Sequence, residues 1–239
     1  MDKLYIVIPA YNEAANIENF VKEWYPIVET IGNSSRMAVF NDGSKDNTLA
    51  ILNELKGKFP FLEVIDKPNS GHGPTCLFAY KYALKNGADY IFQTDSDGQT
   101  KAGDFGKFWE KRKDFDILLG FRKQRGDGIA RLVISRVLRV ILFFIFGEYV
   151  LDANTPFRLM KAGSLAKYVP EIPDNFFLTN SLLTVLYKKN KHKMLWMVVQ
   201  FHERAGGENS INIKQILKLA FKIIKDLRNY NRGIKHAKA

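Results

Sequence analysis

The sequence predicts an α/β protein with a mostly parallel sheet flanked by helices. Short apolar runs bounded by turn formers alternate with segments whose apolar residues recur at helical spacing. This alternation indicates strand–helix–strand units with right-handed crossovers. With 239 residues, of which 46% are hydrophobic, the chain can bury a sizeable core. It contains no internal repeat and no Gly-rich linker that would separate independent domains.

Four strands and three helices are expected first. The strands are the apolar runs 4–8, 37–41, 62–66 and 90–94. The helices between them are expected over 17–31, 47–55 and 71–86. Pro26 is expected to kink or shorten the first helix, because a proline inside a helix removes a backbone hydrogen bond. A strand-like run at 117–120 and an apolar helix over 129–146 follow.

Two carboxylates stand directly after the strand expected over 90–94. In an extended chain Asp95 and Asp97 point the same way, Gly98 lets the backbone turn, and Gln99 adds a carbonyl oxygen. Ligands of open α/β sheets bind at the carboxyl ends of strands. Hard oxygen ligands in low number, with open positions left over, suit Mg²⁺ or Mn²⁺ shared with substrate phosphates. The alternative is a solvated acidic turn.

Further motifs flank this acidic pair in order. They are Pro9-Ala-Tyr11-Asn-Glu13, Asn41-Asp42-Gly-Ser44, the Gly71/Gly73 turn, Asp152-Ala-Asn-Thr-Pro-Phe-Arg158 and Arg204-Ala-Gly-Gly-Glu-Asn-Ser210. Together they resemble the family-2 glycosyltransferases of the GT-A fold. The last two are similar to motifs of the polyprenyl-phosphate sugar transferases, the dolichyl-phosphate mannose synthase group. The likeness covers residues 4 to 215 and implies a GT-A (Rossmann-like) sheet with C-terminal amphipathic helices.

The resemblance implies a role for each matching position. The residues implied in nucleotide-sugar binding are Pro9, Tyr11, Glu13, Asp42, Gly71 and Asp95, and those implied in metal binding are Asp95, Asp97 and Gln99. The residues implied in catalysis are Asp97, Asp152, Arg158 and Arg204. Many relatives carry an acidic residue where this chain has Asn41, which leaves the base, uridine or guanosine, open.

The chemistry accounts for these residue types. Breaking the anomeric bond of a nucleoside diphosphate sugar builds charge on the diphosphate, and a divalent cation neutralises that charge. Arg side chains suit phosphate oxygens because their fork is bidentate. The cations that can share in neutralising this charge are Arg122, Lys123, Arg131, Arg158 and Arg204. The candidates at the acceptor phosphate are Arg122, Arg131, Arg204 and Ser210.

The acceptor decides whether a general base is needed. A polyprenyl phosphate is ionised near neutral pH and can attack without one, whereas a saccharide hydroxyl needs a carboxylate to take its proton. Asp152 is the candidate base. Its alternative role is structural, in orienting Arg158 or a backbone turn. We expect an inverting transfer to polyprenyl phosphate, with a saccharide acceptor as the alternative.

Charge and hydropathy bear on the partners. The net charge is +11, and from Lys188 onward ten Lys and three Arg face only three acidic residues. An anionic partner is therefore expected. Acidic side chains at the strand ends argue against a nucleic-acid-binding module, and we expect no nucleic acid partner. The single Cys76 fits a reducing compartment.

The organisation expected is a GT-A domain over 1–212 and a basic amphipathic helix with its tail over 213–239. No signal peptide is visible, and no apolar stretch reaches the roughly 20 residues of a membrane span. Both 129–146 and 213–228 have an apolar face with cations beside it. Such helices lie on anionic lipid, so we expect peripheral attachment at the cytoplasmic face of the membrane. The alternative is a C-terminal helix packed on the protein.

Overall fold

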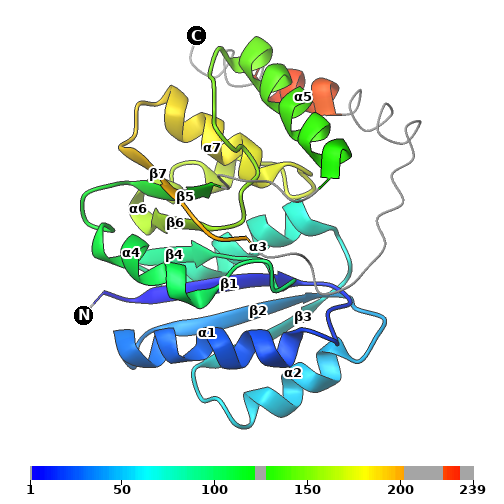
Figure 1. Cartoon of the computed structure of the whole chain (residues 1–239), viewed down its shortest axis with the longest axis vertical. Helices are drawn as coiled ribbons and strands as arrows, with labels where there is room; N and C mark the ends of the chain where they lie inside the picture. The colour runs from blue at the N-terminus through cyan, green and yellow to red at the C-terminus, as the bar shows by residue number, and fades with distance from the viewer. Residues whose placement is uncertain (1, 122–127, 202–222, 232–239) are drawn as a thin grey trace.

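A computed structural model of the chain describes residues 2–121, 128–201 and 223–231, with the backbone alone for 128–134. Its centre is a seven-stranded sheet in the order β3-β2-β1-β4-β6-β5-β7 (Figure 1). The strands are β1 (Leu4–Ala10), β2 (Arg36–Asp42), β3 (Leu62–Lys67), β4 (Tyr90–Gln93), β5 (Ile117–Phe121), β6 (Arg158–Lys161) and β7 (Met194–Val198). β6 runs antiparallel to β4 and β5, and the other pairings are parallel. The expected mostly parallel α/β sheet is confirmed.

Helices cover both faces of the sheet (Figure 1). One face carries α1 (Ile17–Ile31), α2 (Thr48–Lys56) and α4 (Phe105–Glu110), and the other carries α3 (His72–Lys85), α5 (Gly128–Phe146) and α7 (Thr179–Lys189). The short elements are η1 (Ala102–Asp104), α6 (Ala162–Leu165) and η2 (Val169–Glu171). All seven residues of β1 are buried, and its alternate side chains enter the two core clusters on opposite faces. That is the pattern of a central strand.

One local expectation differs from the structure, and two strands were not expected. Helix α1 continues through Pro26 to Ile31, so the proline does not shorten it. Burial of Trp24 and Val28 on either side of Pro26 stabilises the helix against the lost hydrogen bond. The sequence also gave no sign of the antiparallel strand β6 or of β7, which fill the second half of the sheet.

The helical segment 223–231 packs against the outer helix α5 (Figure 1). Asn231 Nδ2 donates to the carbonyl of Ile145 at 2.8 Å. Leu227 is fully buried in the core cluster on the α3 side of the sheet. For this segment the packed alternative is therefore the one observed, while residues 213–222 lie outside the described ones. Of the described helices, none has the length and apolarity to cross a bilayer.

The order of strands places a crevice at one edge of the sheet. β1 lies between β2 and β4, so the chain first builds outward on one side of β1 and then, after α3, returns on the other side. The connections that leave β1 and β4 therefore lead to opposite halves of the sheet. In open α/β sheets ligands bind at this point, beyond the carboxyl ends of the strands.

Candidate active site

A pocket of about 360 Å³ lies at the carboxyl ends of β1, β2 and β4. Its lining residues are Pro9, Ala10, Tyr11, Glu13, Asp42, Asn69, Gly71, His72, Thr75, Asp95, Ser96 and Asp97. Seven of the positions expected at the nucleotide sugar or the metal therefore meet in one place, although they lie at or after the ends of four separate strands. Gln99 is not among the lining residues and its side chain is buried.

The loop after β1 is tied to the loop after β2. Asn12 has a positive φ of 54°, and its backbone N–H donates to Ser44 Oγ at 3.0 Å. The backbone N–H of Glu13 donates to Thr48 Oγ1 at 2.8 Å, and the Glu13 side chain is 6% exposed. Tyr11, by contrast, is 42% exposed at the rim. These bonds fix the loop that carries Tyr11, and Tyr11 lines the pocket while staying accessible.

Asp42 holds the segment that forms one wall of the pocket. Its carboxylate accepts hydrogen bonds from Lys67 Nζ, from the backbone N–H of Ser70 at 2.9 Å and from that of Gly71 at 2.9 Å. Burial by itself raises the pKa of Asp42, but the hydrogen bonds outweigh it, and the pKa lies below its ordinary value. Asp42 therefore holds the backbone of this wall in place. Its contact with the base stays a prediction.

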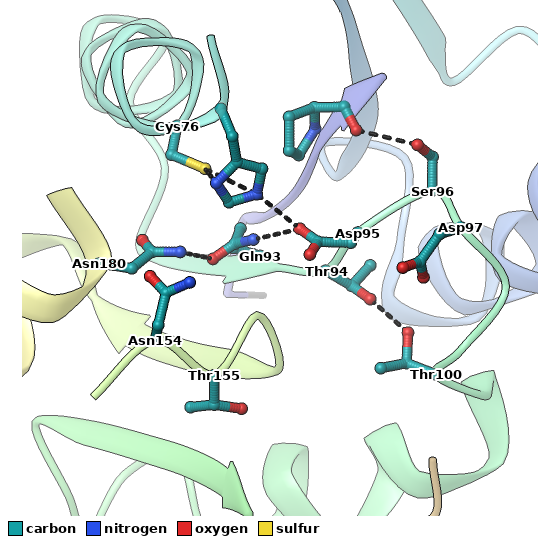
Figure 2. Close-up of polar contacts among 12 residues, drawn as sticks. Cys76, Gln93, Thr94, Asp95, Ser96, Asp97, Thr100, Asn154, Thr155 and Asn180 are labelled. Carbon is teal, nitrogen blue, oxygen red and sulfur yellow. Dashed lines mark hydrogen bonds and ion pairs between the residues drawn. The ribbon is translucent and has the colours of Figure 1, made fainter. Parts of the chain in front are cut away.

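The acidic pair occupies the end of β4 (Figure 2). Asp95 Oδ1 accepts hydrogen bonds from His72 Nε2 and from Gln93 Nε2, each at 3.0 Å. Asp97 Oδ1 accepts one from the backbone N–H of Gln99 at 3.0 Å. Gly98 has φ 72°, so the backbone turns there as the sequence predicts. Both carboxylates consequently line the same pocket.

The donor set of this pair fits a divalent cation. Carboxylate oxygens are the ligands that Mg²⁺ and Mn²⁺ take, and these ions commonly keep only one or two protein carboxylates beside substrate phosphates. Among the described residues, no group of three His, Cys, Asp or Glu side chains is placed to hold a metal. An ion here would therefore complete its coordination with substrate, water or an amide oxygen. Gln99 stays the predicted amide ligand.

His72 was not singled out from the sequence as a functional residue. It is the first residue of α3, lines the pocket and bonds to Asp95. Its Nε2 also lies 3.7 Å from the sulfur of Cys76. Cys76 and Asp95 raise the pKa of the imidazole. The signal in the sequence was the Gly71-His72-Gly73 turn, which opens a helix towards the pocket.

Gly73 brings a second loop close to the same wall. A Cβ at this position would lie 2.0 Å from the carbonyl oxygen of Phe177. Thr179 Oγ1 donates to the carbonyl of Gly73 at 2.8 Å. Only a residue without a side chain permits this contact between the start of α3 and the loop before α7.

A larger hollow of about 670 Å³ lies where β4 and β5 begin, at the other edge of the sheet. Its charged groups are of both signs, and several bond to one another or to backbone. His192 Nδ1 donates to Asp116 Oδ2 at 2.9 Å, and Lys161 Nζ donates to the carbonyl of Lys113 at 2.7 Å. Because ligands of open α/β sheets bind at the carboxyl ends, we assign the active site to the smaller pocket.

Comparison with known proteins agrees with this geometry. The model of the family "Glycosyl transferase family 2" matches residues 5–168, which include every residue lining the pocket. The chain belongs to that family. The predicted family resemblance is therefore confirmed, and the protein is a glycosyltransferase.

Its relatives within glycosyl transferase family 2 include sugar transferases to dolichyl phosphate. A UDP-N-acetylglucosamine–dolichyl-phosphate N-acetylglucosaminyltransferase from Methanococcus voltae is 26% identical over 80% of this chain and 82% of its own. A dolichyl-phosphate beta-glucosyltransferase from Trichomonas vaginalis is 23% identical over 95% of this chain and 72% of its own.

A solved structure supports the GT-A fold. Glucosyl-3-phosphoglycerate synthase from Mycobacterium tuberculosis, in complex with Mn²⁺, uridine diphosphate and phosphoglyceric acid, superposes with a TM-score of 0.67. The match covers 96% of this chain and 78% of the synthase at 15% identity. At that identity the likeness establishes the fold alone.

The second half of this family-2 enzyme places two predicted residues away from the pocket lining. Arg158 is fully buried, and its guanidinium donates to the carbonyls of Thr155 and Asn180. A contact with phosphate would require it to leave these carbonyls, so we assign Arg158 to the frame of the site. Asp152 Oδ1 accepts a hydrogen bond from the backbone N–H of Asn154 at 3.3 Å, which is the backbone-turn role.

The predicted acceptor residues fall mostly beyond the described part of the chain. Arg122, Arg204 and Ser210 lie outside the described residues, and Arg131 lies in the part of α5 that is described by its backbone alone. Their roles at the acceptor phosphate, and that of Arg204 in catalysis, stay predictions.

Proposed function

We propose that this glycosyltransferase moves a sugar from a nucleoside diphosphate sugar to a polyprenyl phosphate, with inversion at the anomeric carbon. The observation that carries the proposal is the meeting of Asp95 and Asp97 with Tyr11 and Asp42 in one pocket at the switch point of the sheet. The acceptor class follows from the two relatives that act on dolichyl phosphate. Their sequence similarity along most of this chain supports the same class of acceptor here.

The donor is held by the walls of the pocket. The exposed ring of Tyr11 stacks on the base, and the segment fixed by Asp42 contacts the ribose and diphosphate through its backbone. Asp95 and Asp97 would hold a Mg²⁺ or Mn²⁺ ion, which when bound acts as a Lewis acid on the leaving diphosphate. Pro9 and Glu13 complete the nucleotide side.

The acceptor side requires no general base in this proposal. A phosphate monoester has a second pKa near 6 and attacks as an anion. Asp152 then serves the turn before β6, as its hydrogen bond to Asn154 suggests. Arg122, Arg131, Arg204 and Ser210 are proposed to bind the acceptor phosphate. With a saccharide acceptor, as in cell-surface polysaccharide synthesis, Asp152 would instead be the base.

Helix α5 is the proposed contact with the membrane. Val140, Phe143 and Phe144 are 54%, 47% and 80% exposed, and Arg136 and Arg139 line the same hollow of about 420 Å³. Exposed aromatic and aliphatic side chains beside cations are typical of helices that lie in the headgroup region of anionic lipid. We propose peripheral attachment at the cytoplasmic face.

Vesicle flotation tests the attachment. At low salt the protein should float with phosphatidylcholine vesicles that contain phosphatidylglycerol and should stay in solution with phosphatidylcholine alone. The double variant Phe143→Ser, Phe144→Ser should float less than Phe78→Ser, which changes an exposed aromatic on another helix. Equal flotation of the two variants would remove α5 from the proposal.

A transfer assay tests the reaction itself. A panel of uridine and guanosine diphosphate sugars is incubated with Mg²⁺ or Mn²⁺, with and without a short polyprenyl phosphate. We expect one donor to yield a glycolipid of inverted configuration by NMR, and Asp97→Asn to slow its formation by about 10²–10³. Transfer to a saccharide, with none to the lipid phosphate, would replace this proposal by the alternative with Asp152 as base.

A further inference from the structure

A chain of buried polar side chains ends on Asp95. Tyr80 O–H donates to Asn180 Oδ1 at 2.7 Å, Asn180 Nδ2 donates to Gln93 Oε1 at 2.9 Å, and Gln93 Nε2 donates to Asp95 Oδ1 at 3.0 Å. Figure 2 shows the links from Asn180 through Gln93 to Asp95. Tyr80 and Gln93 are fully buried and Asn180 is 2% exposed. The chain thus joins α3, α7 and β4 to the pocket.

The carboxylate of Asp95, at the end of this chain, determines the direction of every hydrogen bond in it. A carboxylate only accepts, so the Gln93 amide must turn its NH₂ to Asp95 and its oxygen to Asn180. Asn180 then offers its own oxygen to Tyr80. Burial raises the pKa of Tyr80 well above its ordinary value, so the phenol keeps its single proton and donates it. Hydrogen bonds that all point one way polarise and strengthen one another.

The same chain is anchored from the neighbouring strand. Arg158 Nη1 donates to the backbone carbonyl of Asn180 at 3.0 Å, which fixes the first turn of α7. Gln93 and Arg158 are register partners on β4 and β6. Neither amide of the chain can therefore rotate without breaking bonds in a buried region, where an unmet polar group is costly.

We propose that Tyr80, Asn180 and Gln93 are positioning residues that orient the carboxylate of Asp95 for the cation. Among the described residues, both hydrogen bonds to that carboxylate, from Gln93 and from His72, end on Oδ1. They fix the plane of the carboxylate and reserve Oδ2 for a cation in the pocket. This inference rests on the proposed function, because that proposal makes Asp95 a metal ligand. Groups behind a metal ligand typically change metal affinity 10–100-fold when they are removed.

The test measures metal binding separately from turnover. Free Mn²⁺ is followed by electron paramagnetic resonance while Mn²⁺ is added to protein saturated with uridine or guanosine diphosphate. Gln93→Leu should raise the Mn²⁺ dissociation constant about tenfold or more, as expected for the loss of a group behind a ligand. Tyr80→Phe removes the hydroxyl that bonds to Asn180 Oδ1 and, at 3.1 Å, to Gln93 Oε1, but it keeps both amides, so it should raise the constant less. Nucleotide affinity in chelator should be unchanged in both variants.

Tyr187→Phe is the matched control. Tyr187 is also a fully buried tyrosine, and its hydroxyl bonds to Ser164 at 2.9 Å, outside the chain that ends on Asp95. It should lose stability comparably to Tyr80→Phe yet keep the wild-type Mn²⁺ constant. Tyr80→Phe also covers the case in which Gln93→Leu fails to fold.

The outcomes separate this inference from the function beneath it. Wild-type Mn²⁺ binding in Tyr80→Phe, or equal weakening in Tyr187→Phe, would overturn the positioning role and leave the proposed function standing. If Asp95→Asn and Asp97→Asn bound Mn²⁺ as the wild type does, the metal site itself would be wrong and both would fall.

Discussion

Replacing Asp42 by Asn tests whether this carboxylate shapes the pocket or serves only as a base contact. The carboxylate is 3% exposed and accepts hydrogen bonds from Lys67, Ser70 and Gly71. An asparagine keeps one acceptor oxygen but presents an NH₂ group to donors on the other side. It also removes the charge partner of the Lys67 ammonium, whose side chain is 12% exposed.

The expected cost follows from these contacts. Removing one partner of a buried ion pair typically destabilises a protein by about 3–5 kcal/mol. Lys67 keeps its bonds to the carbonyl of Pro68 at 2.8 Å and to Ser70 Oγ at 2.7 Å, which lessen the penalty on its charge. We therefore expect the lower end, about 3 kcal/mol. Because the wall loses its anchor, nucleotide affinity should fall as well.

Urea unfolding at pH 7 measures the stability, and titration calorimetry with uridine and guanosine diphosphate measures the affinity. The control is Asp174→Asn, which breaks an ion pair with Lys81 in which Asp174 is 88% exposed. It should leave both quantities nearly unchanged. If Asp42→Asn unfolded with the wild-type free energy while nucleotide binding was lost, Asp42 would serve the base alone, and our reasoning about the wall would be refuted.

Three further outcomes are expected. The pKa of Asp42 in the folded protein is lowered. The ionised Asp42 therefore stabilises the folded state fully well above the unfolded pKa of about 4, and this stabilisation is lost as the pH falls. The difference in unfolding free energy between wild type and Asp42→Asn should narrow between pH 5 and pH 3. Gly73→Ala should lower Tm by forcing the Phe177 carbonyl away, at a cost of about 1–3 kcal/mol, whereas Gly106→Ala, with open space around its Cβ, should not lower it. Asp97→Asn should reduce kcat by about 10²–10³, as for a lost group that stabilises transition-state charge, and added Mn²⁺ should restore little of it.

The first half of the fold was predictable because each of its strands can be recognised from its own stretch of sequence. β1 to β4 are apolar runs between turn formers, and each begins and ends within about two residues of the expected range. β6 has only four residues and begins with an arginine. It becomes a strand because Leu159 pairs with Phe92 and Leu118 on its two neighbours, and such pairing is not visible in a local pattern.

The site divides in the same way. Carboxylates at strand ends could be assigned to one pocket, since parallel strands end at a common edge. Arg158 was expected to act in catalysis because it lies in a motif of the family resemblance and because the arginine fork suits phosphate oxygens. In the structure its partners are carbonyls supplied by Thr155 and the distant Asn180. The sequence did not single out Gln93, because its role depends on a contact with Asn180 of α7, which is distant in the sequence.

The polar chain behind Asp95 has a cost that the fold alone does not explain. Tyr80 belongs to the apolar cluster that also contains Leu182, Leu183 and Ile91, and Gln93 and Asn180 are buried as well. Apolar side chains of similar size would pack there without the desolvation of two amides and a phenol. The chain's benefit must then be in orientation. Because Asn180 belongs to α7 and Asp95 follows β4, the proposed orientation would couple helix α7, in the second half of the chain, to the carboxylate proposed to hold the cation.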